Sequence, residues 1–150
     1  MKFQPILAAA CLVAATAAIA QERAMKPESQ VKLRKSAYAL MNYNFATLEA
    51  MAEGKRAYDK EAAGKAADWV ANLSDVPRHF FGEGTDKVEG TRAKPEIWQK
   101  RSDFDAKMDK MVAEAKKLPQ AARADQASLK KAVDATGDAC GACHEDYRKK

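Results

Sequence analysis

Apolar residues recur at helical spacing in four stretches of the chain, and the alternating spacing of strands is missing from the sequence. The first stretch runs from Pro27 to a stop at Gly54, and the second covers residues 57–73. The third covers residues 95–118, and the fourth runs from about residue 121 toward the end. Four amphipathic helices joined by two short links and one long link predict an all-α fold, an antiparallel four-helix bundle.

The predicted inward faces consist mainly of apolar or small side chains spaced three, four or seven positions apart. They are Val31, Tyr38, Met41, Phe45, Leu48 and Met51 or Ala52 in the first helix; Tyr58, Ala62, Ala66, Trp69, Val70 and Leu73 in the second; Ile97, Phe104, Met108, Met111, Ala115 and Leu118 in the third; and Ala122, Leu129, Val133, Thr136, Cys140, Cys143 and Tyr147 in the fourth. The many alanines of the second helix would let a neighbouring helix approach closely.

One long connection, residues 74–94, separates the second and third predicted helices. It holds one proline, three glycines and the adjacent pair Phe80 and Phe81. Loops of this length in compact domains are usually functional or disordered. The two phenylalanines favour a loop that packs on the rest of the domain.

The first twenty residues have the pattern of a secretory signal peptide. A single basic residue, Lys2, precedes an apolar run over residues 6–20, and the run ends in small residues before Gln21. The run is shorter than the roughly 20 residues that a membrane span needs. We therefore expect cleavage before Gln21, export to the periplasm without a membrane anchor, and a single mature domain of residues 21–150. Cys11 would leave with the signal.

Charge gives little indication of a nucleic-acid partner. Charged residues make up 31% of the chain, and the formal charge of +5 falls to +4 when Lys2 is removed with the signal. The sequence holds no block of like charge and no basic patch with interleaved aromatic residues. Solvated helix faces account for the charged residues, so no nucleic-acid binding is expected.

The last helix ends in the pentapeptide CGACH, residues 140–144, which is the C-x-x-C-H pattern of covalent haem attachment. In such sites each thiol adds to a vinyl group and the histidine ligates the iron. Thiols three positions apart on a helix face the same side. Cys140 and Cys143 are therefore predicted to bind one haem c, with His144 as axial ligand.

Other readings of the two cysteines are less well supported. A structural zinc site needs four ligands. Besides the two thiols and His144, the mature chain offers only the distant His79. A thioredoxin-like motif expects a strand-helix setting at a helix start, whereas this pair lies at the end of a long helix. A plain disulfide between Cys140 and Cys143 is an alternative that the spacing leaves open.

The opposite side of the haem must come from an earlier helix, because only six residues follow His144. Arg34 interrupts the apolar face of the first helix. Its aliphatic stem could pack on this face while its charged head reaches water. Alternatively, its guanidinium could hold a haem propionate. Tyr38, one turn on, would lie over the iron unless it is an ordinary core aromatic. A neutral phenol is a poor ligand, so we expect five-coordinate iron, with Met41 or His79 as the alternative sixth ligand.

At this point the chain resembles the class II c-type cytochromes, and among them the cytochromes c prime. The segments that carry the resemblance are KPESQVKLRKSAYALM, VPRHFFGEGT, AKPEIW and CGACHEDYRKK. A C-x-x-C-H motif at the C-terminal end of a four-helix bundle is typical of that class. The resemblance implies the same fold and one covalently bound haem c.

The family resemblance also implies roles for individual residues around the haem. Arg34 would contact a propionate, Lys35 would contact the haem more weakly, and Tyr38 would face the vacant iron position, which makes the iron high-spin. Arg148 would lie close to the proximal face of the haem. Phe81 would pack on the ring, and the segment that begins with Thr91 and Arg92 and runs to residue 94 would approach the haem edge.

Proteins similar to this one are periplasmic, bind nitric oxide or carbon monoxide while excluding oxygen and most anions, and often form homodimers through their first two helices. The resemblance therefore predicts a gas-binding haem protein, possessing no enzymatic activity, with a role in nitrosative stress or electron transfer. The alternative is a low-spin electron carrier with a methionine ligand and a periplasmic redox partner. A peroxidase is not expected, because the first helix lacks a distal histidine and arginine pair. The small residues of the second helix are a further reason to expect a dimer.

Overall fold

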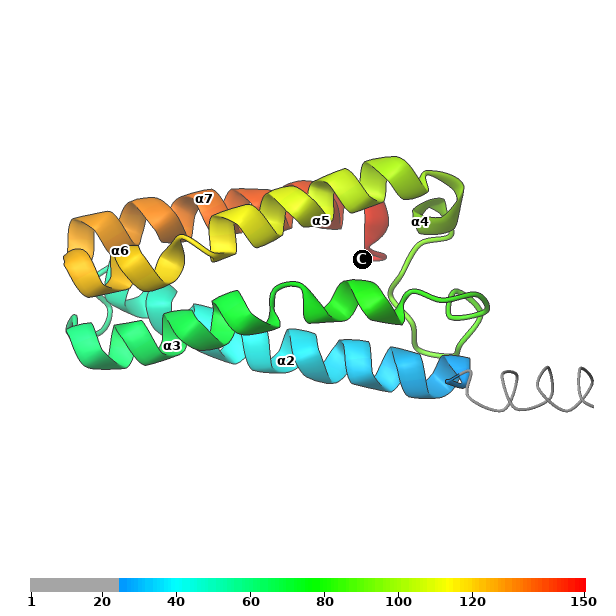
Figure 1. Ribbon diagram of the computed structural model, residues 1–150, viewed down its shortest axis with the longest axis horizontal. Coiled ribbons are helices and arrows are strands. Elements are labelled where there is room, and N and C mark those ends of the chain that lie inside the picture. The colour runs from blue at the N-terminus through cyan, green and yellow to red at the C-terminus, as the bar shows by residue number, and fades with distance from the viewer. Residues whose placement is uncertain (1–24) are drawn as a thin grey trace, which may run out of the picture.

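The computed structural model describes residues 25–150, so the predicted signal peptide lies outside the described residues. The long helices are α2 (Pro27–Ala52), α3 (Lys60–Leu73), α5 (Arg101–Ala115) and α7 (Gln126–Tyr147); the short ones are η1 (Val76–Phe80), α4 (Glu96–Gln99) and α6 (Leu118–Ala124). In Figure 1, α2 and α3 form one layer, and α5, α6 and α7 form the other. The predicted all-α four-helix bundle is confirmed.

The two ends of the bundle differ in their connections. The helix α6 lies at one end, whereas the long connection, α4 and the C-terminus gather toward the other end (Figure 1). Within residues 25–150 no helix is long and apolar enough to cross a membrane.

Capping side chains set the beginnings of two helices. Asp59 accepts a hydrogen bond from the backbone N–H of Ala62 at 2.8 Å, and α3 starts directly after it at Lys60. This cap explains why the helix starts later than the position near residue 57 that the sequence pattern predicts. Asp125 caps α7 in the same way by accepting from the N–H of Ser128 at 2.8 Å.

The third and fourth predicted helices are each divided in two. At Lys100 the backbone leaves helical geometry, with φ −120° and ψ 47°, which separates α4 from α5. At Asp125 the chain becomes extended between α6 and α7. Pro119, expected to stop the third helix, instead lies in the first turn of α6, where a residue without an N–H is tolerated.

The core confirms most of the predicted inward faces. In α5 the predicted residues Phe104, Met108 and Met111 are all buried, and in α2 Met41 and Leu48 are buried. The prediction is wrong for Trp69, which is 56% exposed. The inward face of α3 consists of small residues, and the bulky indole at position 69 lies outside it.

The small face of α3 allows a close helix contact inside the protein. Ala63, Ala66 and Ala67 are buried. A Cβ atom added at Gly64 would lie 3.0 Å from Cζ of Arg123 in α6. α3 packs closely against α2 and α6 within the chain, as its small residues allow. A dimer contact through these residues stays a prediction.

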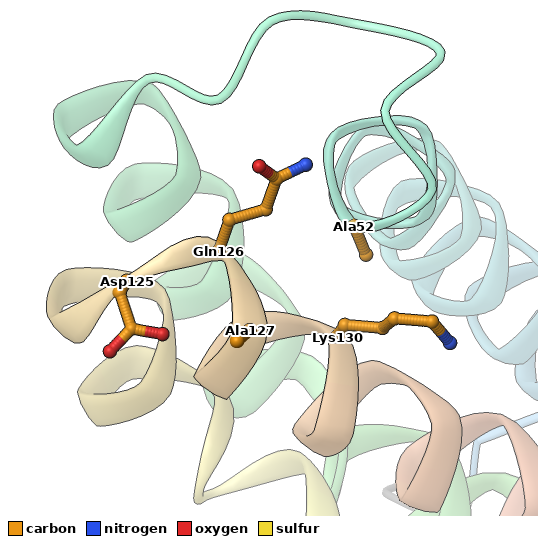
Figure 2. Close-up of a pocket in the computed structure, with 5 residues that line it drawn as sticks. All are labelled: Ala52, Asp125, Gln126, Ala127 and Lys130. Carbon is orange, nitrogen blue, oxygen red and sulfur yellow. The ribbon is translucent and has the colours of Figure 1, made fainter.

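A shallow pocket lies where the end of α2 meets the start of α7. Figure 2 shows its lining residues Ala52, Asp125, Gln126, Ala127 and Lys130. The amide of Gln126 donates a hydrogen bond to the carbonyl oxygen of Met51 at 2.8 Å and so ties the two helices together. This pocket is at the α6 end of the bundle, whereas the cysteines lie in the last two turns of α7.

Candidate functional site

The two cysteines of the pentapeptide lie one turn apart on α7, and both are free and half-buried. Burial raises the pKa of the Cys140 thiol. Burial, followed by the neighbouring Cys140, raises the pKa of Cys143 to about 11. Both thiols are therefore protonated at neutral pH. Within residues 25–150 no group of three or more histidine, cysteine or acidic side chains is placed to hold a metal ion.

His144 extends from the last turn of α7 and is exposed. Its pKa is lowered by the part of the ring that the protein covers, and then by the positive charges of Arg148 and Arg92. The guanidinium Nη1 of Arg148 lies 3.5 Å from Nδ1 of the imidazole. The ring is therefore neutral at pH 7 and has a lone pair for a metal.

Tyr38 lies on α2, packed against the same core as the two cysteines. Burial raises its pKa, and the nearby Cys143 raises it further, so the phenol is neutral. Its hydroxyl donates to the sulfur of Met108 at 3.9 Å, a distance appropriate to a weak thioether acceptor. Met41, the alternative ligand considered from sequence, is buried in the core.

Arg34 is buried, and only 4% of its surface is exposed. One nitrogen, Nη1, donates to the carbonyl oxygen of Phe80 at 2.9 Å, and Nη2 donates to the hydroxyl of Thr91 at 2.9 Å. The guanidinium carbon lies 4.1 Å from the ring centroid of Phe81. The interpretation that the head of Arg34 reaches water is wrong, because the long connection supplies acceptors that cover it.

The structure thus brings Arg34, Phe81 and Thr91 into one cluster. Two other candidates, Lys35 and His79, lie apart from this cluster. Lys35 is exposed and lines a surface groove with Val88 and Glu89. His79 is exposed on η1, where its Nε2 lies 3.6 Å from a carboxylate oxygen of Asp75.

The second half of the long connection pairs with the C-terminus. The N–H of Lys94 donates to the carbonyl oxygen of Tyr147 at 3.0 Å, and the N–H of Lys149 donates to that of Arg92 at 2.8 Å. Between them lies an antiparallel bridge of Ala93 with Arg148. This pairing places Arg92 beside Arg148 and close to His144. No pattern in the sequence indicated it, because it joins segments more than 50 residues apart.

An aromatic cluster holds the ring of Phe81, in the long connection, against α4 and α5. No sequence pattern indicated this cluster. The Phe81 ring contacts that of Phe104 at 4.9 Å and that of Trp98 at 6.2 Å between centroids. Phe104 in turn meets Tyr147 edge-on at 5.4 Å. The hydroxyl of Tyr147 donates to Oδ2 of Asp103 at 2.5 Å. The expectation that the paired phenylalanines belong to a packed loop is confirmed for Phe81, which is buried.

The chemistry of these side chains fits covalent haem. Two free thiols one helical turn apart, followed directly by a neutral imidazole, are the groups that form thioether bonds and ligate iron. A neutral phenol lies near the thiols, and a buried guanidinium lies one turn before it on α2.

Comparison with known proteins agrees with the site. The sequence pattern of the family described as Cytochrome C' matches residues 29–148. Cytochrome c' of Rubrivivax gelatinosus is 40% identical over 126 residues, which cover 83% of this chain and 98% of the relative. Its crystal structure superposes with a TM-score of 0.80 at 39% identity, over 83% of this chain and 98% of that chain.

Two further relatives widen the comparison. Cytochrome c-554 of Cereibacter sphaeroides is 38% identical over 97% of both chains. A nitric oxide complex of a cytochrome c' variant from Alcaligenes xylosoxidans has a TM-score of 0.78 at 36% identity, over 85% of this chain and 99% of that chain. A carbon monoxide-bound variant of the same protein has a TM-score of 0.76 at 37% identity, over 83% and 98%. The chain belongs to the cytochrome c' family, whose members carry covalently attached haem c.

Proposed function

We propose that Cys140 and Cys143 hold the haem through thioether bonds and that His144 is the axial ligand of its iron. The observation that carries the proposal is the pair of half-buried free thiols next to a neutral imidazole at the end of α7. When bound, the haem supplies an iron atom that can take up a small gas and exchange one electron. Arg148, in contact with His144, borders the proximal face.

The distal side is formed by α2. Tyr38 faces the open iron position as a neutral phenol, since burial and the neighbouring Cys143 raise its pKa. A neutral phenol and a buried Met41 leave the iron five-coordinate and high-spin. The methionine-ligated low-spin alternative would require Met41 to leave the core.

The remaining residues line the haem edge. Arg34 turns part of its guanidinium toward a propionate, and Phe81, whose ring lies against Arg34, packs on the haem. Thr91 and Arg92 approach the exposed edge, since Thr91 binds Arg34 and Arg92 binds the C-terminal segment. Lys35 makes a weaker contact from the surface.

The protein binds nitric oxide and carbon monoxide. Support comes from the Alcaligenes xylosoxidans relatives solved with these gases and from the apolar surroundings of Tyr38. An apolar distal side offers water and anions no good partner but admits neutral diatomic gases. The physiological role is protection against nitrosative stress in the periplasm, reached through the signal peptide of residues 1–20, with electron transfer as the second role.

Optical spectra of the purified ferric and ferrous protein, followed by carbon monoxide titration, test the proposal. We expect high-spin spectra in both oxidation states and tight carbon monoxide binding to the ferrous form. Tyr38→Ala should speed carbon monoxide association by opening the distal side. Asn42→Ala is the control, because Asn42 lies on the same helix and its side chain is exposed. A six-coordinate ferrous spectrum before any gas is added would refute the proposal.

Haem attachment is tested separately with Cys140→Ser and Cys143→Ser. Each single variant should retain one thioether bond, and the double variant should lose all haem on a denaturing gel stained for peroxidase activity. Covalent haem in the double variant would contradict the assignment.

The protein forms a homodimer through α2 and α3. The support is four exposed apolar side chains on these helices, Leu33, Leu40, Tyr43 and Trp69. Sedimentation velocity of the holoprotein should give a dimer at micromolar concentration, and Leu40→Glu should dissociate it. A monomeric wild-type protein would overturn this part of the proposal.

A further inference from the structure

Tyr38 and Met108 meet although they come from helices in different layers of the bundle. Tyr38 lies on α2, and Met108 lies on α5 (Figure 1). The helix α2 packs mainly on α3, η1 and α7, whereas α5 packs mainly on α7. The hydroxyl of Tyr38 nevertheless reaches α5, where it donates a hydrogen bond to the sulfur of Met108 at 3.9 Å. The phenol therefore spans the interior of the bundle between the two layers.

The hydroxyl of Tyr38 depends on this sulfur for a partner. Among residues 25–150, the bond to Met108 is the one hydrogen bond that this hydroxyl makes. Burial raises the pKa of Tyr38, and the nearby Cys143 raises it further, so the hydroxyl keeps its hydrogen. A hydroxyl held away from water is destabilised when it has no acceptor. The contact with Met108 therefore fixes the direction in which the hydroxyl points.

Met108 is a fixed acceptor, because it is part of the core. Only 2% of its surface is exposed, and its neighbours on the same face of α5, Phe104 and Met111, are also buried. Side chains packed at the density of a protein interior have little room to move. The sulfur therefore stays where the hydroxyl can reach it.

Packing alone does not explain a methionine at position 108. Leucine has nearly the same volume and replaces methionine in most cores at small cost. The thioether adds a weak hydrogen-bond acceptor and a favourable contact with an aromatic ring. Within the described part of the chain, the other buried methionines, Met41, Met51 and Met111, accept no side-chain hydrogen bond. At position 108 the protein thus uses the chemistry of the sulfur as well as its size.

The direction of the hydroxyl decides what a ligand at the proposed haem would meet. Tyr38 packs against the same core cluster as Cys140 and Cys143, the two residues proposed to hold the haem. Donors on the distal side of a haem are among the features that decide which ligands it takes. A hydroxyl bonded to Met108 is not available to such a ligand, which is left with the apolar part of the phenol.

We propose that Met108 is a specificity-determining residue of the distal side, because its sulfur holds the hydroxyl of Tyr38 toward α5 and so withholds a hydrogen-bond donor from ligands at the iron. The inference rests on the proposed function and names the residue that controls the polarity of that site. Neutral diatomic gases, which need no donor, are accepted. Small anions, which lose their hydration on entry and find no donor to replace it, are disfavoured.

Carbon monoxide binding to the ferrous holoprotein tests where the hydroxyl points. The C–O stretching frequency, measured by infrared spectroscopy, falls when a donor bonds to the gas. The wild type and Tyr38→Phe should have the same frequency, because Met108 holds the wild-type hydroxyl. Met108→Leu should lower the frequency, and the double variant with Tyr38→Phe should restore it. A wild-type frequency below that of Tyr38→Phe would show that the hydroxyl already donates to the gas and would overturn the inference.

Fluoride titration of the ferric holoprotein tests the selectivity. Fluoride is a small anion that accepts hydrogen bonds, so Met108→Leu should raise its affinity about 10-fold or more, the effect of one hydrogen bond to a charged group. Adding Tyr38→Phe should abolish the rise. Met111→Leu is the matched control, because Met111 is buried on the same helix, and it should change the affinity less than about twofold. Equal effects of Met108→Leu and Met111→Leu would show that only packing matters and would overturn the inference.

The two titrations separate this inference from the proposed function. A ferrous protein that binds no carbon monoxide would refute the gas-binding function, while a rise of fluoride affinity in Met108→Leu would still support the role of Met108. Normal carbon monoxide binding, with a stretching frequency and a fluoride affinity that Met108→Leu leaves unchanged, would refute the inference alone.

Discussion

Replacing Arg34 with leucine removes the link between α2 and the long connection. In the folded protein its guanidinium donates to the carbonyl oxygen of Phe80 and to the hydroxyl of Thr91, both at 2.9 Å. Hydrogen bonds from a charged donor each contribute about 1.5 to 3 kcal/mol, so the two together contribute about 3 to 6 kcal/mol. Burying the cation offsets part of this, as its lowered pKa indicates. We expect a net loss of about 2 to 4 kcal/mol of unfolding free energy.

Urea unfolding of the ferric holoprotein measures this loss. With an m-value of about 2 kcal/mol per molar, the midpoint should fall by about 1 to 2 M. The matched control is Lys32→Leu at an exposed position two residues earlier, which should change stability by less than about 0.5 kcal/mol. Arg34→Lys keeps the charge, but the lysine cannot reach both acceptors. Its loss of stability should therefore lie between those of Arg34→Leu and the control.

Amide hydrogen exchange shows whether the effect is local. The N–H groups of Thr85 and Thr91 bond within the loop, to Gly82 and Val88 respectively, and Arg34→Leu should speed their exchange more than that of α3 amides. If Arg34→Leu is as stable as Lys32→Leu, or if amide exchange in the loop is unchanged, then Arg34 does not hold the connection and the reasoning fails.

Three further predictions concern the packing that supports the site. The hydrogen bond to Asp103 raises the pKa of Tyr147 to about 12, so the folded state favours the neutral phenol. This stabilisation is complete below the ordinary pKa of about 10 and is lost as the pH rises from about 10 to about 12. Across that pH range the unfolding free energy of Tyr147→Phe should therefore fall less than that of the wild type. Urea midpoints that fall by the same amount in the two proteins would contradict this. Asp125→Ala removes the cap of α7 and should cost about 1 kcal/mol in urea unfolding, whereas the exposed mid-helix control Asp138→Ala should not. Phe104→Leu loses two ring contacts and leaves a cavity, so thermal unfolding should show a loss of about 2 to 4 kcal/mol; a loss below about 1 kcal/mol would mean that the aromatic cluster is loosely packed.

Part of the fold and site could be predicted because the signals are local. The helical spacing of Phe104, Met108 and Met111 reflects a buried face that any bundle of this length must cover. The spacing of Cys140, Cys143 and His144 fixes their relative positions on one helix whatever the rest of the chain does.

Other features had no local signal. Trp69 was assigned to the inward face from its spacing, but the structure leaves it 56% exposed because the close helix contacts of α3 select its small residues. The breaks at Lys100 and Asp125 were also missed. The seven-residue spacing of Ile97 and Phe104 carries the apolar stripe across Lys100, so periodicity does not reveal that break. Asp125 interrupts the stripe, but an interruption does not show that the backbone becomes extended there.

The sequence by itself determined four helices, one long connection and a haem-attachment pentapeptide, since each depends on residues within a few turns of one another. Only the tertiary structure decided which groups meet across the molecule. The Thr91 hydroxyl that accepts a hydrogen bond from Arg34 is 57 positions away in the sequence. Arg92 donates to the carbonyl oxygen of Lys149 over the same separation. Such contacts depend on the path of the whole chain, because a hydrogen bond between distant segments forms only after packing has brought their backbones together.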